Sequence, residues 1–205
     1  MSNLFVFSMP LDMKHTFITE KISDSFERLV PDVTSVDRFG TSMQYQRERR
    51  FAKFTVLNTS NKFEMLYENK TYEFSQNVDD FRNMSRRFEP IEPSVRNSEF
   101  IKTFINMVTT WASQSTLRPL LFSSISVSVH QVRQIATSYS FSDNSPEGIH
   151  RDGSDFIVSA LVVSRHNILG GKSIVYAPDR RKIVLNHTLK SGEGLFHEDR
   201  MLWHD

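Results

Sequence analysis

The spacing of apolar residues changes along the chain, from a helical period in the N-terminal part to a strand period in the C-terminal part. Residues 97–112 place apolar side chains three and four positions apart, which predicts a helix with one buried face. Asn97 or Ser98 is expected to cap its N-terminus. The apolar stripe consists of Phe100, Ile101, Phe104, Ile105, Val108 and Trp111. We expect Phe100, Phe104 and Trp111 to pack this helix against a sheet.

The rest of the N-terminal part predicts one more helix, several strands and a connector. Apolar positions in residues 14–30 lie near helical spacing and predict an amphipathic helix that ends at Pro31. A strand is expected over residues 50–57, beside a basic cluster, and two shorter strands are expected within residues 58–74. Two prolines in residues 88–95 predict an extended connector.

After Pro119 the pattern takes the two-residue period of strands. Ile125, Val127 and Val129 alternate with Ser126, Ser128 and His130, which predicts a strand with one buried face. Short apolar segments separated by Gly, Pro, Asn and Asp follow at 156–163, 172–178, 181–189 and 194–203. Helices followed by many short strands predict a mainly β fold, a sandwich or small barrel with flanking α-helices. We expect one domain over residues 1–205, in which 1–119 pack on a core formed by 120–205.

Composition and charge exclude several classes of site and partner. The 205 residues include 25 Lys and Arg against 24 Asp and Glu, and the net charge of +1 gives no reason to expect a nucleic-acid or membrane partner. The chain has no cysteine, which excludes disulfides, thiolate zinc sites and cysteine nucleophiles. The N-terminus lacks the features of a signal peptide, and no window is apolar enough to span a membrane. A cytoplasmic protein is therefore expected.

The segment EGIHRDGSDF, residues 147–156, places His150 and Asp152 two positions apart. On an extended segment such residues point to the same side. An imidazole and a carboxylate joined by one distant histidine form a set that typically binds Fe(II) and leaves coordination positions open. The same pair can also be two solvated loop residues. The residues by themselves leave the third ligand open among the downstream histidines His187, His197 and His204.

Several segments, in the same order, resemble the bacterial 2-oxoglutarate/Fe(II) dioxygenase family that includes L-isoleucine and L-leucine hydroxylases. They are FEPIEP (88–93), HQVRQIA (130–136), PEGIHRDGSDF (146–156), RHNILGGKSIVY (165–176) and SGEGLFHEDRMLWH (191–204). The resemblance covers residues 45–205. It implies a double-stranded β-helix (a jelly roll, cupin-like). It also implies an enzyme that uses Fe(II), 2-oxoglutarate and O₂ to hydroxylate a small molecule, such as a free amino acid.

The resemblance also assigns the metal ligands. His150 and Asp152 match the first two ligands of the family. His204, which follows the bulky Trp203, matches the third and is preferred over His197. These three residues are therefore the expected metal-binding and catalytic residues.

The cosubstrate site departs from the family pattern. In the family, a final strand after the third ligand brings an Arg to the distal carboxylate of 2-oxoglutarate, and this strand is not found before Asp205. We expect Lys172 to replace that Arg, with Arg133 as second choice. Gln131 shares the predicted inner face of its strand with Arg133 and is a further candidate for binding 2-oxoglutarate. Arg133 can instead leave the sheet toward solvent.

The missing strand also bears on activity and assembly. Without the Arg, 2-oxoglutarate is expected to bind weakly. The alternative function is therefore a catalytically inactive or truncated jelly-roll module that binds a metal or a partner. An unpaired sheet edge favours a homo-oligomer.

Overall fold

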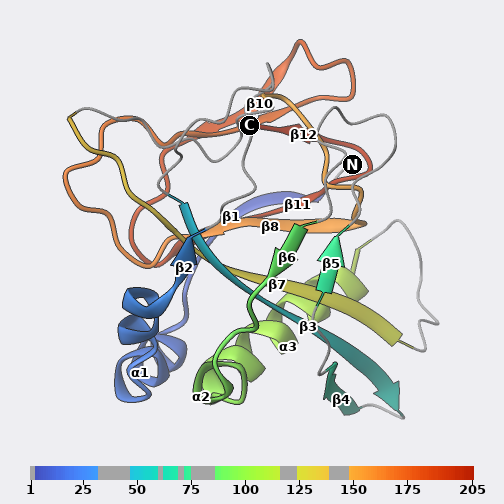
Figure 1. The fold of residues 1–205 in the computed structure, drawn as a ribbon. Helices are drawn as coiled ribbons and strands as arrows, with labels where there is room; N and C mark the ends of the chain where they lie inside the picture. The colour runs from blue at the N-terminus through green and yellow to red at the C-terminus, as the bar shows by residue number, and fades with distance from the viewer. Residues whose placement is uncertain are drawn as a thin grey trace. The chain divides into compact units, whose positions relative to one another are not determined.

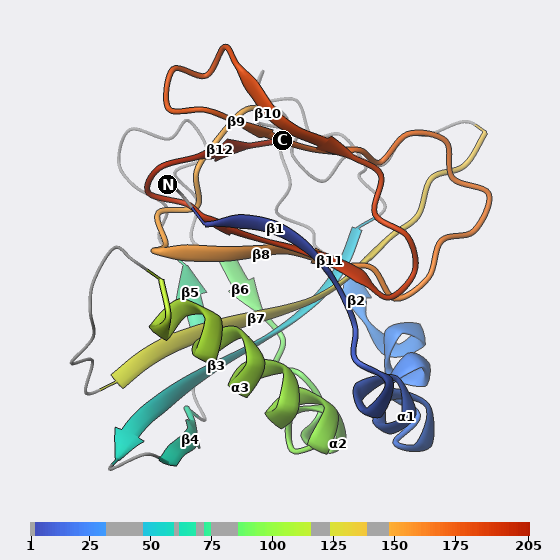
Figure 2. The ribbon, with the colours of Figure 1, turned by 180° about the vertical axis from the view of Figure 1, so that it is seen from behind.

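The computed structural model describes residues 3–31, 47–59, 62–68, 72–74, 86–115, 124–138 and 148–205. These residues form a mainly β structure with flanking helices, drawn in Figure 1 and from behind in Figure 2. The expected fold class is confirmed, and the architecture is consistent with a double-stranded β-helix. Contacts divide the chain into a central unit, His15–Asp143, and a C-terminal unit, Met1–Lys14 with Asn144–Asp205. The organisation as one domain stays a prediction.

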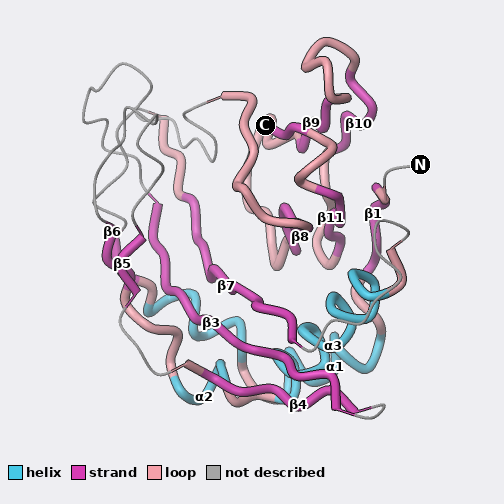
Figure 3. The backbone as a smooth tube through the Cα atoms, turned by 90° about the vertical axis from the view of Figure 1, so that its right-hand side faces the viewer, coloured by secondary structure: helices cyan, strands magenta, loops and turns pink. Residues whose placement is uncertain are grey.

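The central unit is built around one long strand. Strand β3 (Arg47–Thr59) pairs along one edge with β7 (Ser124–Gln134) and along the other with β2 (Val30–Pro31) and β4 (Lys62–Tyr67), all antiparallel. Figure 3 shows β3 and β7 running side by side. The short strands β5 (Tyr72–Phe74) and β6 (Arg86–Phe88) pair with each other. These strands confirm the predictions over residues 50–57 and 58–74.

Strand β7 has the predicted alternation. Ile125, Val127 and Val129 are half-buried, whereas Ser126, Ser128 and His130 are exposed. The alternation continues at Gln131, which is buried on the same face as the apolar residues. The period of the sequence alone therefore identified the inner face of this strand.

Helix α3 (Glu99–Ser113) confirms the helix predicted over residues 97–112, and Figures 2 and 3 show it lying along the β3–β7 sheet. Ser98 is the N-cap, and its hydroxyl accepts the backbone N–H of Ile101 at 3.2 Å. Phe100 is buried, and its ring stacks on that of Phe104 with the centroids 6.3 Å apart. Phe104 and Trp111 are half-buried.

The single helix predicted over residues 14–30 is wrong in its extent. Helix α1 (Leu11–Thr19) ends early, Lys21 takes a left-handed conformation with φ 52°, and a 3₁₀ helix η1 (Ile22–Arg28) follows. A 3₁₀ helix repeats every three residues.

Tertiary contacts explain this interruption. The carboxylate of Glu20 accepts the backbone N–H groups of Glu99 (2.9 Å) and Phe100 (3.1 Å) at the start of α3. In η1, the three-residue period buries Ile22 and Ser25. The Ser25 hydroxyl donates to the Ile22 carbonyl at 2.6 Å, so the polar residue is satisfied inside the fold.

The connector predicted over residues 88–95 is extended only in its first half. Pro90 makes an isolated bridge with Phe51, and helix α2 (Pro93–Arg96) then begins. The expectation is wrong for the last three residues because Pro93 occupies the first helical position, where its missing N–H has no cost.

The C-terminal unit contains two three-stranded antiparallel sheets. The first has the order β1 (Leu4–Ser8), β11 (Glu193–Glu198), β8 (Phe156–Leu161). The second has the order β10 (Ile183–His187), β9 (Ser173–Tyr176), β12 (Trp203–His204). A buried cluster of Val175, Leu189, Leu195 and Leu202 forms the core.

The strands of this unit confirm those expected after residue 156. No helix within the described ranges is long and apolar enough to cross a membrane.

Candidate metal centre

The backbone brings His150 and His204 directly opposite each other. His150 lies in the segment that precedes β8, and His204 ends β12. The two residues exchange backbone hydrogen bonds, with His150 N donating to His204 O at 3.0 Å and His204 N donating to His150 O at 3.1 Å. Their imidazole ring centroids lie 4.3 Å apart. Two histidines 54 positions apart in sequence are thus held side by side by main-chain bonds.

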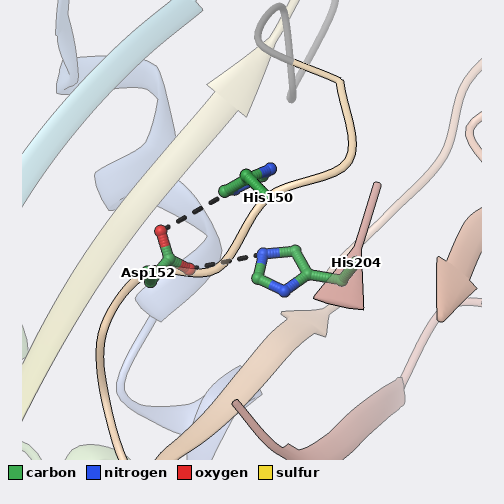
Figure 4. Close-up of side chains that lie close together, drawn as sticks. All are labelled: His150, Asp152 and His204. Carbon is green, nitrogen blue, oxygen red and sulfur yellow. Dashed lines mark ion pairs between the residues drawn. The ribbon is translucent and has the colours of Figure 1, made fainter. Parts of the chain in front are cut away.

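Asp152 completes a group of three side chains of the types that can bind a metal, shown in Figure 4. Its Oδ1 lies 3.8 Å from His150 Nε2, and its Oδ2 lies 3.4 Å from His204 Nε2. The potential ligand atoms of the three residues all lie within 4.8 Å of one another. The structure therefore brings together the three residues expected from the sequence, and their role as ligands stays a prediction.

The two histidines of this group are half-buried or buried, whereas Asp152 faces solvent. The exposed fractions of the side chains are 18% for His150, 11% for His204 and 51% for Asp152. His150 Nδ1 lies 2.8 Å from the carbonyl of Gly148, to which it donates in the tautomer that leaves Nε2 free to ligate. A backbone acceptor on the second ring nitrogen is the usual support of a metal-ligating histidine.

The group fits the metal that its donor set predicts. Two imidazole nitrogens and one carboxylate oxygen are the protein ligands of non-haem Fe(II) sites with open positions. Neighbouring ligands at about 2.1 Å from a metal, set at right angles, lie roughly 3 Å apart. The distances of 3.8 and 3.4 Å run from the two histidines to different oxygens of Asp152, and the potential ligand atoms of all three residues lie within 4.8 Å of one another. Small side-chain movements would bring them to this spacing.

Asp199 lies behind His204 and is fully buried. Its Oδ2 accepts the backbone N–H groups of Gly153 (2.8 Å) and Ser154 (3.1 Å), directly after Asp152. Its Oδ1 lies 3.6 Å from His204 Nδ1. Burial, and then the negative charge of Asp152, raise the pKa of the Asp199 carboxyl. No local pattern in the sequence points to the contact of Asp199 with the segment that follows Asp152.

His197, the weighed alternative to His204, belongs to a second and more enclosed group. Its imidazole is fully buried on β11, and its Nε2 lies 2.8 Å from the hydroxyl of Ser159. Burial, and then the neighbouring His204, lower its pKa to about 4. The donor atoms of His197, Asp199 and His204 also lie within 4.8 Å of one another. His197 and Asp199 are fully buried, whereas Asp152 of the first group is half exposed, so the second group leaves less room for a cosubstrate.

Arg151, between the first two candidate ligands, ties their segment to β12. Its Nε donates to the Leu202 carbonyl at 3.2 Å, and its guanidinium lies 4.2 Å from the ring centroid of Trp203. The guanidinium of Arg180 lies 3.4 Å from the same centroid. No local signal in the sequence connects Arg151 to Trp203.

The candidate cosubstrate residues lie in different parts of the chain. Lys172 is exposed, just before β9. His204 pairs with Val175, so the side chains of these two residues point to the same side of the sheet. Side chains alternate along β9, so Ile174, and by extension Lys172, points to the side away from His204. Its role with 2-oxoglutarate stays a prediction.

Arg133 and Gln131 belong to the central unit and already have partners there. Arg133 makes ion pairs with Glu48 (2.6 Å) and Glu27 (2.5 Å). The hydrogen bonds in these pairs, to Glu48 first and then to Glu27, raise the pKa of Arg133. Gln131 donates to the Ser25 hydroxyl at 2.5 Å. A role of either residue in binding 2-oxoglutarate stays a prediction.

His187, the remaining histidine considered as third ligand, lies on β10. Its Nε2 is 3.1 Å from a carboxylate oxygen of Glu193. Within the described residues, it belongs to neither group of potential ligands.

Comparison with known proteins gives a family and a fold. The model of the 2OG-Fe dioxygenase family matches residues 23–205. A crystal structure of a bsmA homologue from Methylobium petroleophilum PM1 is similar with a TM-score of 0.73 and 22% identity, over 96% of this chain and 73% of that chain. The structure of IDO from Bacillus thuringiensis is similar with a TM-score of 0.68 and 16% identity, over 98% and 82% of the two chains. No curated protein matches.

Proposed function

Because the chain belongs to the 2OG-Fe dioxygenase family, whose cofactors are Fe(II), 2-oxoglutarate and O₂, we propose that His150, Asp152 and His204 hold the iron of a hydroxylase. The observation that carries this proposal is the convergence of these three side chains through the backbone bridge between His150 and His204. The sequence pattern supports the same three residues.

The bound cofactors supply the oxidising power that inserts one oxygen atom of O₂ into a C–H bond, while 2-oxoglutarate loses CO₂ and becomes succinate. The chain's own residues orient and enclose this chemistry. The Gly148 carbonyl fixes the ring of His150, and the bridge fixes the spacing of the two histidines. The exposed Asp152 marks the side on which cosubstrate and substrate enter.

A free amino acid is the proposed substrate, and the sequence resemblance to L-isoleucine and L-leucine hydroxylases supports it. Lys172 is the first proposed partner of the distal carboxylate of 2-oxoglutarate, with Arg133 and Gln131 after it. A lysine supplies charge but lacks the fork of an arginine, so binding through Lys172 is expected to be weaker than through an arginine.

The test is succinate formation by the Fe(II)-loaded protein with 2-oxoglutarate and a panel of amino acids. Alanine variants of His150, Asp152 and His204 are each expected to lose both iron and turnover, and the His187→Ala variant is the matched histidine control. If His204→Ala retains iron and His197→Ala loses it, the third ligand is His197 and not His204. Iron binding without any succinate would favour the alternative, a metal-binding module without turnover.

A companion experiment addresses the cosubstrate. Anaerobic titration of the iron-loaded protein with 2-oxoglutarate, followed by the metal-to-ligand absorption band, gives its affinity. Lys172→Ala is expected to weaken this affinity more than Arg133→Ala does. The reverse order would indicate that Arg133, and not Lys172, binds the distal carboxylate of 2-oxoglutarate.

A further inference from the structure

The carboxylate of Asp199 joins the two chain segments that carry the candidate ligands. Asp199 directly follows β11, and its carboxyl group is fully buried. Its Oδ2 accepts two successive backbone N–H groups, from Gly153 and Ser154, at 2.8 and 3.1 Å. Gly153 has φ 80°, a conformation that glycine adopts without strain. This bend after Asp152 turns both N–H groups toward one oxygen.

The second oxygen of Asp199 faces His204 and has no hydrogen-bond donor among the described residues. Asp199 Oδ1 and His204 Nδ1 lie 3.6 Å apart, and neither makes a hydrogen bond with the described residues. Buried polar atoms are nearly always paired in folded proteins, so two such atoms facing each other call for a specific explanation. The other ring nitrogen of His204, Nε2, faces Asp152.

Metal binding accounts for this arrangement. A neutral imidazole carries one proton, and a metal bound at His204 Nε2 leaves that proton on Nδ1. The proton then points at Asp199 Oδ1, and a small movement turns the 3.6 Å separation into a hydrogen bond. The buried acceptor gains its donor only in the tautomer that can ligate through Nε2.

We infer that Asp199 is a positioning residue of the metal centre, which orients His204 through Nδ1 and anchors the segment that carries Asp152. The inference rests on the proposed function, because it takes His204 and Asp152 as ligands. One carboxylate thereby controls ligands from two distant segments. Such support of a ligating histidine typically changes metal affinity by about 10–100-fold.

The Asp199→Asn variant separates this role from a purely structural one. The amide keeps one oxygen, but its NH₂ group must face either the His204 N–H or the two backbone N–H groups, so one contact is lost. We expect Fe(II) affinity, measured anaerobically by titration calorimetry, to fall by about 10–100-fold. Asp155→Asn is the matched control, because Asp155 is a half-exposed aspartate in the same region that pairs with Arg200. It is expected to bind Fe(II) as the unmodified protein does.

A second measurement needs no variant and therefore does not depend on how Asp199→Asn folds. In the unmodified protein loaded with Zn(II), a diamagnetic substitute, ¹⁵N-edited NMR of the histidines reports which nitrogen of His204 is protonated. We expect a slowly exchanging proton on Nδ1. A proton on Nε2, with the metal on Nδ1, would overturn the inference.

The His204→Ala variant distinguishes failure of this inference from failure of the proposed function. If His204→Ala loses Fe(II) and Asp199→Asn binds it as tightly as the unmodified protein, the ligand set stands and the role of Asp199 is refuted. If His204→Ala keeps its Fe(II) affinity, the proposed ligand set is wrong and the inference falls with it. A loss in both variants, with the control unchanged, supports both.

Discussion

The buried imidazole of His197 makes the stability of the metal-free protein depend on pH. Its ring is fully buried on β11, and burial together with His204 lowers its pKa to about 4 from 6.5. In the unfolded chain the imidazole is solvated and binds a proton at the ordinary pKa. Between these two values the unfolded state binds more protons than the folded state, so the free energy of unfolding falls as the pH is lowered through this window.

The size of the effect follows from the two pKa values. A difference of about 2.5 pH units, at about 1.4 kcal/mol for each, gives a limit of about 3 kcal/mol below pH 4. At pH 5 the same two values give a loss of about 2 kcal/mol relative to pH 7.5. For a protein whose total stability is about 5–15 kcal/mol, this loss is large enough to measure.

The assay is urea unfolding of the chelator-treated protein at several values between pH 7.5 and pH 5. The His197→Gln variant keeps a nitrogen near Ser159 Oγ and removes the titrating group. We expect its free energy of unfolding to change by about 2 kcal/mol less over this range than that of the unmodified protein. His15→Gln, on the exposed surface of α1, is the control and should not reduce the change. Equal pH dependence of His197→Gln and the unmodified protein would refute the reasoning.

Three further variants test the fold and the site. Glu20→Gln removes the charge that accepts two N–H groups at the start of α3, and urea unfolding should show a loss of about 1 kcal/mol that shrinks at high salt. Arg151→Ala removes the contacts with Leu202 and Trp203 and should weaken Fe(II) binding in calorimetry without changing the circular dichroism; an unchanged affinity would contradict this. Leu195→Ala leaves a cavity in the buried core and should lower the free energy of unfolding, measured in urea, by about 2–5 kcal/mol. A smaller loss would mean that neighbouring side chains move in and fill the cavity.

The sequence by itself determined the elements whose pattern is local. Helix α3 and the inner face of β7 follow from the three- to four-residue period of a helix and the two-residue period of a strand, while the sequence left the cap of α3 open between Asn97 and Ser98. The order of helices and strands predicted a mainly β fold, and the family match confirms the resemblance at the level of the family. His150 and Asp152 were found because two candidate ligands stand two positions apart in one short segment.

Only the tertiary structure decided features that depend on residues far apart in the chain. Helix α1 ends where Glu20 meets the start of α3, although the apolar spacing continues beyond it.

The candidate metal centre depends on such contacts as well. The sequence offered three histidines as third ligand, and the backbone bridge places His204 beside His150. Asp199 reaches both the Asp152 segment and His204 because the turn after β11 folds back against them. A periodic pattern in the sequence indicates which face of a helix or strand is buried. The partner of a buried polar group depends on packing between elements, so the partners of Asp199 became visible only in the folded chain.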